Sequence, residues 1–296
     1  MKIGIDLGGS HIGIGVIDKN FKIVDKKEKD ITEQDKLNIK KTLIDNIVYI
    51  INQLLKENNI NKDNIECIGI ASPGIISDQS IINANNLKIY EFNIVKQINR
   101  YFDVRIMINN DAKCAAMAEK KCGILKKYSD CIFLSLGTGI GGACFLKDEL
   151  LKPKKYQAFE LGHMIIQIDG KTCSCGNKGC FEAYASIKSL KQQVKEKLKI
   201  DNEITGKLLL EAINNNIKEL DCILDKYSKY LAIGLINLIN IFEPEAIALG
   251  GSFVYYKDIL LDKVKNNINY FNQLNKPEIL IANFKNDAGI IGSILM

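Results

Sequence analysis

Short apolar segments of strand length alternate with longer segments of helical periodicity, and this alternation constrains the fold more than any other feature of the chain. Lys2–Leu7 and Cys131–Leu136 are apolar runs that end in glycine-rich turns. Residues 36–58 instead repeat their apolar side chains at helical spacing, with lysines on the outer face. The alternation predicts an α/β fold. Further strands are expected at 12–18, 21–30, 65–71, 104–108, 142–146, 246–249 and 278–282, and further helices at 91–102, 112–121, 189–198, 207–220, 221–242, 257–271 and from Ala288.

A glycine-rich turn follows a strand twice, once in each half of the chain. The first is Asp6-Leu7-Gly8-Gly9-Ser10 and the second is Leu136-Gly137-Thr138-Gly139-Ile140-Gly141-Gly142. A chain of 296 residues suggests two domains, at about 100–200 residues per domain. The repeated turn therefore predicts two related lobes that face each other across a cleft.

The charge balance and the lack of long apolar segments exclude several classes of protein. The 40 Lys and Arg residues exceed the 35 Asp and Glu by only five, and the lysines have acidic neighbours, so no nucleic-acid partner is expected. Asp6 interrupts the N-terminal apolar run, and residues 230–242 are shorter than the roughly 20 that a membrane span requires. Nine cysteines without an export signal predict a reducing, cytoplasmic location.

The two glycine-rich turns are candidate phosphate-binding sites. Glycine lets the backbone approach a ligand closely, and successive N–H groups in a turn attract anions. The hydroxyls of Ser10 and Thr138 add hydrogen-bond donors, and Asp6 could hold the Mg²⁺ that accompanies a nucleotide. The alternative is that each turn is only a tight hairpin. Neither turn has the spacing of a P-loop, which is thereby excluded.

A cluster of cysteines predicts a structural zinc site. His163 is followed by Cys173, Cys175 and Cys180. Three thiolates and one imidazole form a tetrahedral ligand set of the kind that structural zinc prefers. A redox-sensitive or merely loop-stabilising thiol group is the alternative. The other six cysteines lie singly among apolar neighbours and are interpreted as core residues, namely Cys67, Cys114, Cys122, Cys131, Cys144 and Cys222.

Three carboxylates are candidates for direct roles in chemistry. Asp111 stands where a predicted strand meets a predicted helix, so it is either a helix N-cap or a general base. Glu160 and Glu182 flank the cysteine cluster and could accept hydrogen bonds from the hydroxyls of a polyol. The alternative for both glutamates is a solvated surface charge.

Together these motifs resemble the ROK family, the bacterial group of repressors, open reading frames and sugar kinases. The matching motifs run through essentially the whole chain: Asp6 to Ser10, Ser72-Pro73-Gly74, Ala84-Asn85-Asn86-Leu87, Asn110-Asp111, Leu136 to Gly142, Glu160-Leu161-Gly162-His163, the run from Gly170 to Glu182, and Gly250-Gly251-Ser252. The resemblance implies a two-lobed fold of the actin, Hsp70 and hexokinase type (ribonuclease H-like), with ATP and sugar in the cleft between the lobes. Its N-terminal lobe would comprise residues 1–109 completed by the C-terminal helix at 284–296, and its C-terminal lobe residues 110–283 with the zinc-binding loop.

The resemblance also implies an activity, which is ATP-dependent phosphorylation of a hexose at its 6-hydroxyl in a cytoplasmic homodimer. Glucose is the favoured sugar, and N-acetylmannosamine or another hexose derivative is the alternative. A non-catalytic sugar sensor or repressor is the rival. Family repressors carry a helix-turn-helix ahead of the core, and no repressor is expected here because the first core strand begins at Lys2.

Each motif acquires a role from the resemblance. Asp111 would be the catalytic base. The sugar would be held by Asn86, Asn110, Asp111, Glu160, His163 and Glu182. Mg²⁺ and the nucleotide would be bound by Asp6, Gly8, Gly9, Ser10, Gly137, Thr138, Gly139, Gly250, Gly251 and Ser252. Zinc would be bound by His163, Cys173, Cys175 and Cys180, with His163 also reaching a sugar hydroxyl.

This chain departs from the family pattern near the sugar and phosphate sites. His11 stands where the family often has Lys, and Ser10 where Thr is usual. Asn85 stands where Pro is common, and the chain has no Trp. None of these departures removes a proposed catalytic group. Asn85 and the missing Trp lie near the expected sugar pocket, so these two bear on which sugar is bound.

Overall fold

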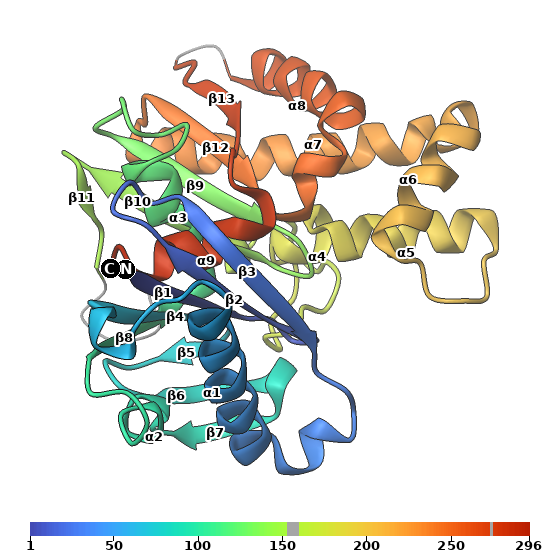
Figure 1. Ribbon diagram of the computed structural model, residues 1–296. Coiled ribbons are helices and arrows are strands. Elements are labelled where there is room, and N and C mark those ends of the chain that lie inside the picture. Colours follow the sequence, from blue (N-terminus) through green and yellow to red (C-terminus); the bar gives the residue numbers. More distant parts are fainter. Residues whose placement is uncertain (153–159, 273–274) are drawn as a thin grey trace. The chain divides into compact units, whose positions relative to one another are not determined.

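The N-terminal apolar segments form a five-stranded sheet in the computed structural model, which describes residues 1–152, 160–272 and 275–296 (Figure 1). Its strand order is β3-β2-β1-β4-β8, in which β1, β2 and β3 are antiparallel and β1, β4 and β8 are parallel. The strands are β1 (Lys2–Leu7), β2 (His11–Ile17), β3 (Ile23–Asp30), β4 (Cys67–Ser72) and β8 (Arg105–Asn110).

Side-chain alternation along β1 gives the two faces of this sheet different partners. Ile3, Ile5 and Leu7 are fully buried in a core shared with α1 (Ile39–Glu57). Gly4 points to the opposite face, where a Cβ would lie only 2.2 Å from the carbonyl oxygen of Ile290. That face is covered by α9 (Ala288–Ser293). Asp6 shares the parity of Gly4, so its carboxylate is placed beside α9.

The first compact unit comprises Met1–Lys126 and Asn286–Met296 among the described residues. It extends beyond residue 109 because α3 (Asp111–Lys121) packs directly against α9. A Cβ on Gly292 would lie 1.7 Å from the backbone oxygen of Cys114, so the two helices approach as closely as glycine allows. The expected boundary at 109 had assigned this helix to the other lobe, whereas its packing assigns it to the first unit.

Replacing Gly292 by Ala is expected to destabilise the protein by about 1–3 kcal/mol, because the new methyl group overlaps backbone that cannot rotate away. Gly206→Ala is the matched control, since its Cβ would lie at an ordinary contact distance of 3.6 Å from the Tyr256 hydroxyl. Urea unfolding followed by circular dichroism measures both variants. Equal stabilities for the two would contradict the close packing of α3 and α9.

The second compact unit comprises Lys127–Lys152 and residues 160–285 apart from 273–274. Its sheet has the order β11-β10-β9-β12-β13 and repeats the strand directions of the first sheet. The strands are β9 (Cys131–Leu136), β10 (Ile140–Leu146), β11 (Glu149–Leu150), β12 (Ala246–Gly250) and β13 (Glu278–Ile281). Each sheet therefore begins with a hairpin closed by one of the glycine-rich turns, which confirms the prediction of two related α/β units.

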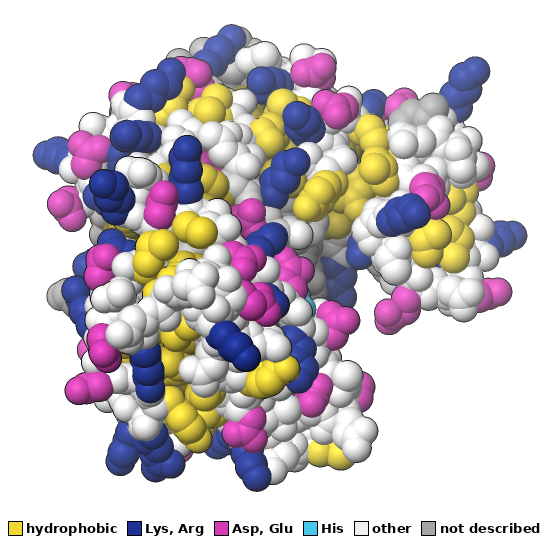
Figure 2. All heavy atoms as spheres, viewed as in Figure 1, with side chains coloured by type: hydrophobic (Ala, Val, Ile, Leu, Met, Phe, Trp, Pro, Cys, Tyr) yellow, Lys and Arg dark blue, Asp and Glu magenta, His cyan; other side chains and the backbone are white. Residues whose placement is uncertain are grey.

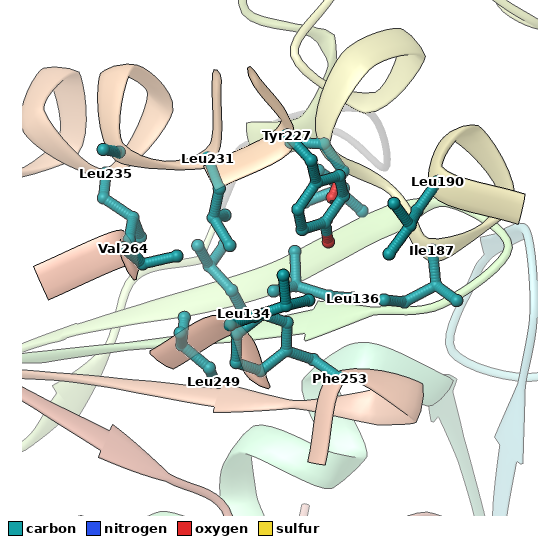
Figure 3. Packing of buried hydrophobic residues seen from close by; sticks show 14 of the residues in the cluster. Leu134, Leu136, Ile187, Leu190, Tyr227, Leu231, Leu235, Leu249, Phe253 and Val264 are labelled. Atoms are coloured by element: carbon teal, nitrogen blue, oxygen red, sulfur yellow. Dashed lines mark hydrogen bonds between the residues drawn. The ribbon is translucent and has the colours of Figure 1, made fainter. Parts of the chain in front are cut away.

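The core of the second unit lies between its sheet and its helices. Leu134 and Leu249 of the strands pack against Leu231 of α7 (Ile217–Phe242) and Val264 of α8 (Lys257–Phe271) (Figure 3). Tyr227 is fully buried in the same core and donates a hydrogen bond of 2.9 Å to the carbonyl oxygen of Ala185. The helices are α4 (Glu182–Ala185), α5 (Ile187–Leu198), α6 (Gly206–Asn215), α7 (Ile217–Phe242) and α8 (Lys257–Phe271).

A small antiparallel sheet in the first unit was not predicted. It consists of β5 (Ile75–Ile76), β6 (Ile81–Ala84) and β7 (Ile89–Phe92) in that order. The expected helix at 91–102 is therefore wrong at its start, and the observed helix α2 is short (Ile94–Ile98). Asn93 begins it by accepting a hydrogen bond of 2.8 Å from the Lys96 N–H.

Surface features agree only in part with the sequence expectations. Basic and acidic side chains lie interspersed on the face drawn in Figure 2. Among the single cysteines predicted to be core residues, Cys222 is exposed and Cys122 is half-buried, whereas the other four are buried. None of the helices in the described ranges combines the length and the apolar character of a membrane span.

Candidate functional site

The first glycine-rich turn joins β1 to β2, and among the described residues two of its backbone N–H groups have no hydrogen-bond partner. The N–H of Gly8 donates to the carbonyl oxygen of His11 at 2.8 Å and closes the turn. Within the described part of the chain, no hydrogen bond engages the N–H of Gly9 or of Ser10. Successive free N–H groups in a tight turn form a concavity that suits an anion. The turn is thus a hairpin that also has donors to offer a phosphate.

Asn86 lies beside this turn. It belongs to a short 3₁₀ turn (Asn85–Leu87) between β6 and β7. A Cβ on Gly9 would lie 3.2 Å from the Cβ of Asn86. A predicted sugar ligand and a predicted phosphate turn are therefore neighbours within the first unit. Asn85 is engaged separately, because its side-chain oxygen accepts a hydrogen bond of 3.1 Å from the Tyr90 hydroxyl.

Asp6 carries a carboxylate in an environment that disfavours its charge. Its oxygens lie 2.6 and 2.7 Å from where a Cβ on Gly289 would stand, and no ion pair or hydrogen bond engages them among the described residues. Burial, together with repulsion from Asp111 and Glu28, raises the pKa of Asp6 from 3.8 to about 7. A bound divalent cation would relieve this cost, so the environment fits the predicted Mg²⁺ ligand.

Asp6→Asn is expected to change how stability depends on pH. The folded state binds this proton more tightly than the unfolded chain does, so ionisation destabilises the fold as the pH rises from about 4 to about 7. Below pH 4 the carboxyl is protonated in both states, and above pH 7 the difference is constant. Urea unfolding without divalent cations should therefore show wild type losing stability relative to Asp6→Asn between pH 4 and 7. A stability difference that does not change over this range would contradict the assignment.

The junction of β8 and α3 shows which residue caps the helix. The side chain of Asn110 caps α3, accepting hydrogen bonds from the N–H groups of Ala112 at 3.1 Å and Lys113 at 3.3 Å. Asp111 is the first helical residue, and its carboxylate accepts the Ala112 N–H at 2.8 Å. The N-cap interpretation of Asp111 is wrong. Because Asp111 also raises the pKa of Asp6, the two carboxylates are close enough to repel each other.

The second glycine-rich turn, between β9 and β10, has the same donors as the first. The N–H of Gly137 donates to the carbonyl oxygen of Gly139 at 2.9 Å. In the described ranges, the N–H groups of Thr138 and Gly139 have no hydrogen-bond partner. Ser252 lies next to it, with its hydroxyl 3.9 Å from the Cβ position of Gly137.

A tight backbone turn places Gly250 to Ser252 at this position. Gly250 pairs with Ser135 at the parallel ends of β12 and β9. Gly251 has φ +64°, and a Cβ there would meet the Leu136 carbonyl oxygen at 2.8 Å. The structure thus brings together the two second-unit segments that were predicted to contact the nucleotide.

The predicted metal ligands also converge. The candidate ligand atoms of His163, Cys173, Cys175 and Cys180 all lie within 4.8 Å of one another. The sulfurs of Cys175 and Cys180 are 3.7 Å apart, and Nδ1 of His163 is 3.7 Å from the sulfur of Cys173. A tetrahedral zinc with Zn–S bonds of about 2.3 Å separates its sulfurs by about 3.8 Å. The four residues therefore fit a zinc ion.

Glycines shape the loop that holds these ligands. Gly176 has φ +91° and donates its N–H to the Cys173 carbonyl oxygen at 3.0 Å, which turns the chain back between the cysteines. Gly179 has φ +80°, and a Cβ there would lie 1.9 Å from the Gln167 carbonyl oxygen. The spacing of glycines within the cysteine motif is thus a requirement of the backbone.

The candidate metal ligands lie in residues 163–180, called the metal loop below, and the two glutamates beside this loop differ in environment. Glu160 is exposed, and its carbonyl oxygen accepts the His163 N–H at 2.9 Å, so it lies one turn from a metal ligand. Glu182 is half-buried and accepts hydrogen bonds from the Ile140 N–H at 3.0 Å and the Ser174 hydroxyl at 2.9 Å. The interpretation of Glu182 as a solvated charge is wrong.

Two residues that contact the candidate site, Ser174 and Gly289, were not predicted. Ser174 lies inside the cysteine motif, where a hydroxyl between two predicted ligands could have been noticed. Gly289 gave no local signal, because its role comes from the approach of α9 to Asp6.

Known proteins to which this chain is similar include xylose repressors and glucokinases. It is 31% identical to the xylose repressor of Bacillus subtilis (strain 168), covering 98% of this chain and 75% of the repressor. It is 27% identical to a glucokinase of Halalkalibacterium halodurans, covering 98% and 92%. The fold matches a ROK family glucokinase from Streptomyces griseus, solved with glucose and AMPPNP, with a TM-score of 0.84 at 23% identity over 99% of this chain and 97% of that one.

A ROK hexokinase from Thermus thermophilus also matches the fold, with a TM-score of 0.78 at 24% identity over 99% of this chain and 96% of that one. These two structures and the repeated sheet order confirm the expected two-lobed fold of the actin and hexokinase type. The family resemblance inferred from the motifs is tested separately, by a family model that covers the chain. The ROK family model matches residues 2–296, and on this match the chain belongs to the ROK family.

Proposed function

We propose that this protein is an ATP-dependent sugar kinase that phosphorylates the 6-hydroxyl of a hexose, with glucose favoured. The observation that carries the proposal is the pair of equivalent hairpin turns. Each has two successive N–H groups that no other group in the described ranges accepts from, and that could donate to phosphate oxygens. The glucokinase of Halalkalibacterium halodurans, which matches almost the whole chain, supports the same activity.

The first unit would provide the groups that bind Mg²⁺ and phosphate, accept the hydroxyl proton and orient the sugar. Asp6 would hold Mg²⁺, directly or through water. The turn Gly8 to Ser10 would bind the phosphates, with the N–H groups of Gly9 and Ser10 as the donors. Asp111 would accept the proton of the attacking hydroxyl, and Asn86 and Asn110 would orient the sugar. The elevated pKa of Asp6 supports a site in which added negative charge requires a cation.

In the second unit, the proposal assigns sugar, phosphate and nucleoside contacts. Glu160 and His163 would form hydrogen bonds with sugar hydroxyls. Glu182 would accept a further hydrogen bond from a sugar hydroxyl, besides those from the Ile140 N–H and the Ser174 hydroxyl. Gly137 to Gly139 would contact the phosphates and Gly250 to Ser252 the nucleoside. The zinc bound by the three cysteines and His163 would be structural and would hold this loop in shape.

Phosphoryl transfer then proceeds mainly through positioning. The sugar oxygen forms a bond to the γ-phosphorus as the bond to the ADP oxygen breaks, and the hydroxyl proton passes to the Asp111 carboxylate. Because the transition state is loose, charge neutralisation by N–H groups and Mg²⁺ contributes most. The base adds a further factor of about 10²–10⁴.

A second candidate function is sugar sensing without catalysis, and the 31% identity to a xylose repressor favours it. Xylose offers a sharp discrimination, because its pyranose form has no 6-hydroxyl. A hexose 6-kinase cannot phosphorylate it, whereas a xylose sensor would bind it without consuming ATP.

The test is ADP release from MgATP by the purified chain with glucose, N-acetylmannosamine or xylose. We expect ADP release with a hexose, formation of the hexose 6-phosphate, and no turnover with xylose. If the chain binds xylose, and no hexose causes ADP to be released from MgATP, the sensor function would replace the kinase proposal. A cytoplasmic homodimer belongs to the same proposal, and light scattering on the purified chain measures the assembly.

A further inference from the structure

We infer that Glu182 is a positioning residue that couples the metal loop to the second glycine-rich turn, so that metal binding sets the affinity for the nucleotide phosphates. The inference rests on the proposed function, because it takes the turn as a phosphate site. It assigns Glu182 a role different from the sugar contact that the family resemblance implies.

One oxygen of Glu182 holds the glycine turn. Its Oε2 accepts a hydrogen bond of 3.0 Å from the Ile140 N–H, which immediately follows the turn. A Cβ on Gly139 would lie 2.3 Å from the same oxygen, so the carboxylate occupies the space that any other residue would need. The glycine at 139 thus serves the approach of Glu182 to the backbone.

The other oxygen of Glu182 holds the metal loop. Its Oε1 accepts a hydrogen bond of 2.9 Å from the hydroxyl of Ser174, which lies between the ligands Cys173 and Cys175. The Cys173 sulfur is itself 3.7 Å from Oε1. Glu182 also follows the ligand Cys180 by two residues. A metal that fixes these three cysteines therefore restrains both the donor and the acceptor of this bond.

The glycine turn is attached at both of its ends, and Glu182 provides one of these attachments. At the other end, the Gly137 carbonyl oxygen accepts a hydrogen bond of 3.1 Å from the Lys188 N–H at the start of α5. Between these attachments lie the unpaired N–H groups of Thr138 and Gly139 in the described structure. Loss of the Glu182 attachment would release one end of the turn and misalign the donors, and binding energy depends on such prior alignment.

Binding of Mg·ADP without sugar, measured by calorimetry, separates this role from a sugar contact. Ser174→Ala keeps all four metal ligands and removes the hydroxyl, so we expect full zinc content and an Mg·ADP Kd raised about tenfold. Ser129→Ala is the matched control, because the Ser129 hydroxyl also bonds a carboxylate, that of Asp148 at 3.0 Å, away from the metal loop. The control should bind Mg·ADP like wild type.

Metal removal supplies a second readout. Chelation should raise the Mg·ADP Kd of wild type by a larger factor than that of Glu182→Gln, because the variant has already weakened the link. Thermal unfolding checks that each variant is folded.

Two outcomes would overturn the inference in different ways. If wild type binds Mg·ADP and Ser174→Ala, Glu182→Gln and the metal-free protein all bind it equally well, the coupling is absent while the nucleotide site stands. If wild type binds no nucleotide, the proposed kinase function fails, and this inference fails with it.

Discussion

Replacing Asp111 by Asn is expected to lower kcat for sugar phosphorylation by about 10²–10⁴, while the Kd for Mg·ATP stays near that of wild type. A sugar hydroxyl is a poor nucleophile at neutral pH, and its proton must leave as the phosphoryl group arrives. The Asn side chain keeps the size of Asp but cannot accept that proton. Initial rates over a range of sugar concentrations measure kcat and KM separately.

The helix cap does not complicate this experiment. Asn110 caps α3, so the cap survives the substitution at 111. Asp201→Asn, at an exposed position, is a matched control for the chemical change and should retain full turnover. A folded Asp111→Asn protein with near wild-type turnover on every sugar that the parent phosphorylates would remove Asp111 from the mechanism.

Replacing Cys180 by Ser is expected to reduce zinc from about one per chain to less than about a tenth, since a structural site needs all four ligands closed around the ion. The Cys180 side chain is fully buried, so the hydroxyl of Ser would also be removed from water. His163 belongs to the same ligand set, and the sugar KM should therefore rise as well. Inductively coupled plasma mass spectrometry measures the metal.

Cys222→Ser is the matched control, because Cys222 is exposed and lies outside the ligand set. It should keep full zinc content and wild-type kinetics. Full zinc in Cys180→Ser, or a metal-free wild type with undiminished sugar binding, would contradict the assignment of these four residues.

The regular elements were predicted well where periodicity is local. The strand Cys131–Leu136 and the helix Lys257–Phe271 have the predicted limits. The expected helix at 91–102 was wrong at its start because Ile89–Phe92 instead pairs with Ile81–Ala84. Backbone pairing to another strand outweighs a weak local preference, and nothing in the local pattern reports the partner.

For the candidate site, too, the sequence predicted the features that depend on neighbouring residues, and the structure was needed for those that depend on distant ones. The metal ligands and both glycine turns were predicted because their chemistry depends on residue types within a few positions of one another. The N-cap interpretation of Asp111 was excluded only when the structure showed Asn110 as the cap, since both side chains accept the Ala112 N–H, and the role of Asp111 as base stays a prediction.

By itself, the sequence determined the α/β class and the two related units, and it predicted the candidate metal ligands and the candidate phosphate turns. These follow from periodicity, spacing and side-chain chemistry, which are short-range properties. Only the tertiary structure decided that Asp6 has a pKa of about 7 and that Glu182 joins the metal loop to a turn 42 residues earlier in the chain. Both depend on groups that packing brings together from distant segments, where burial and repulsion act through space and leave no pattern along the chain.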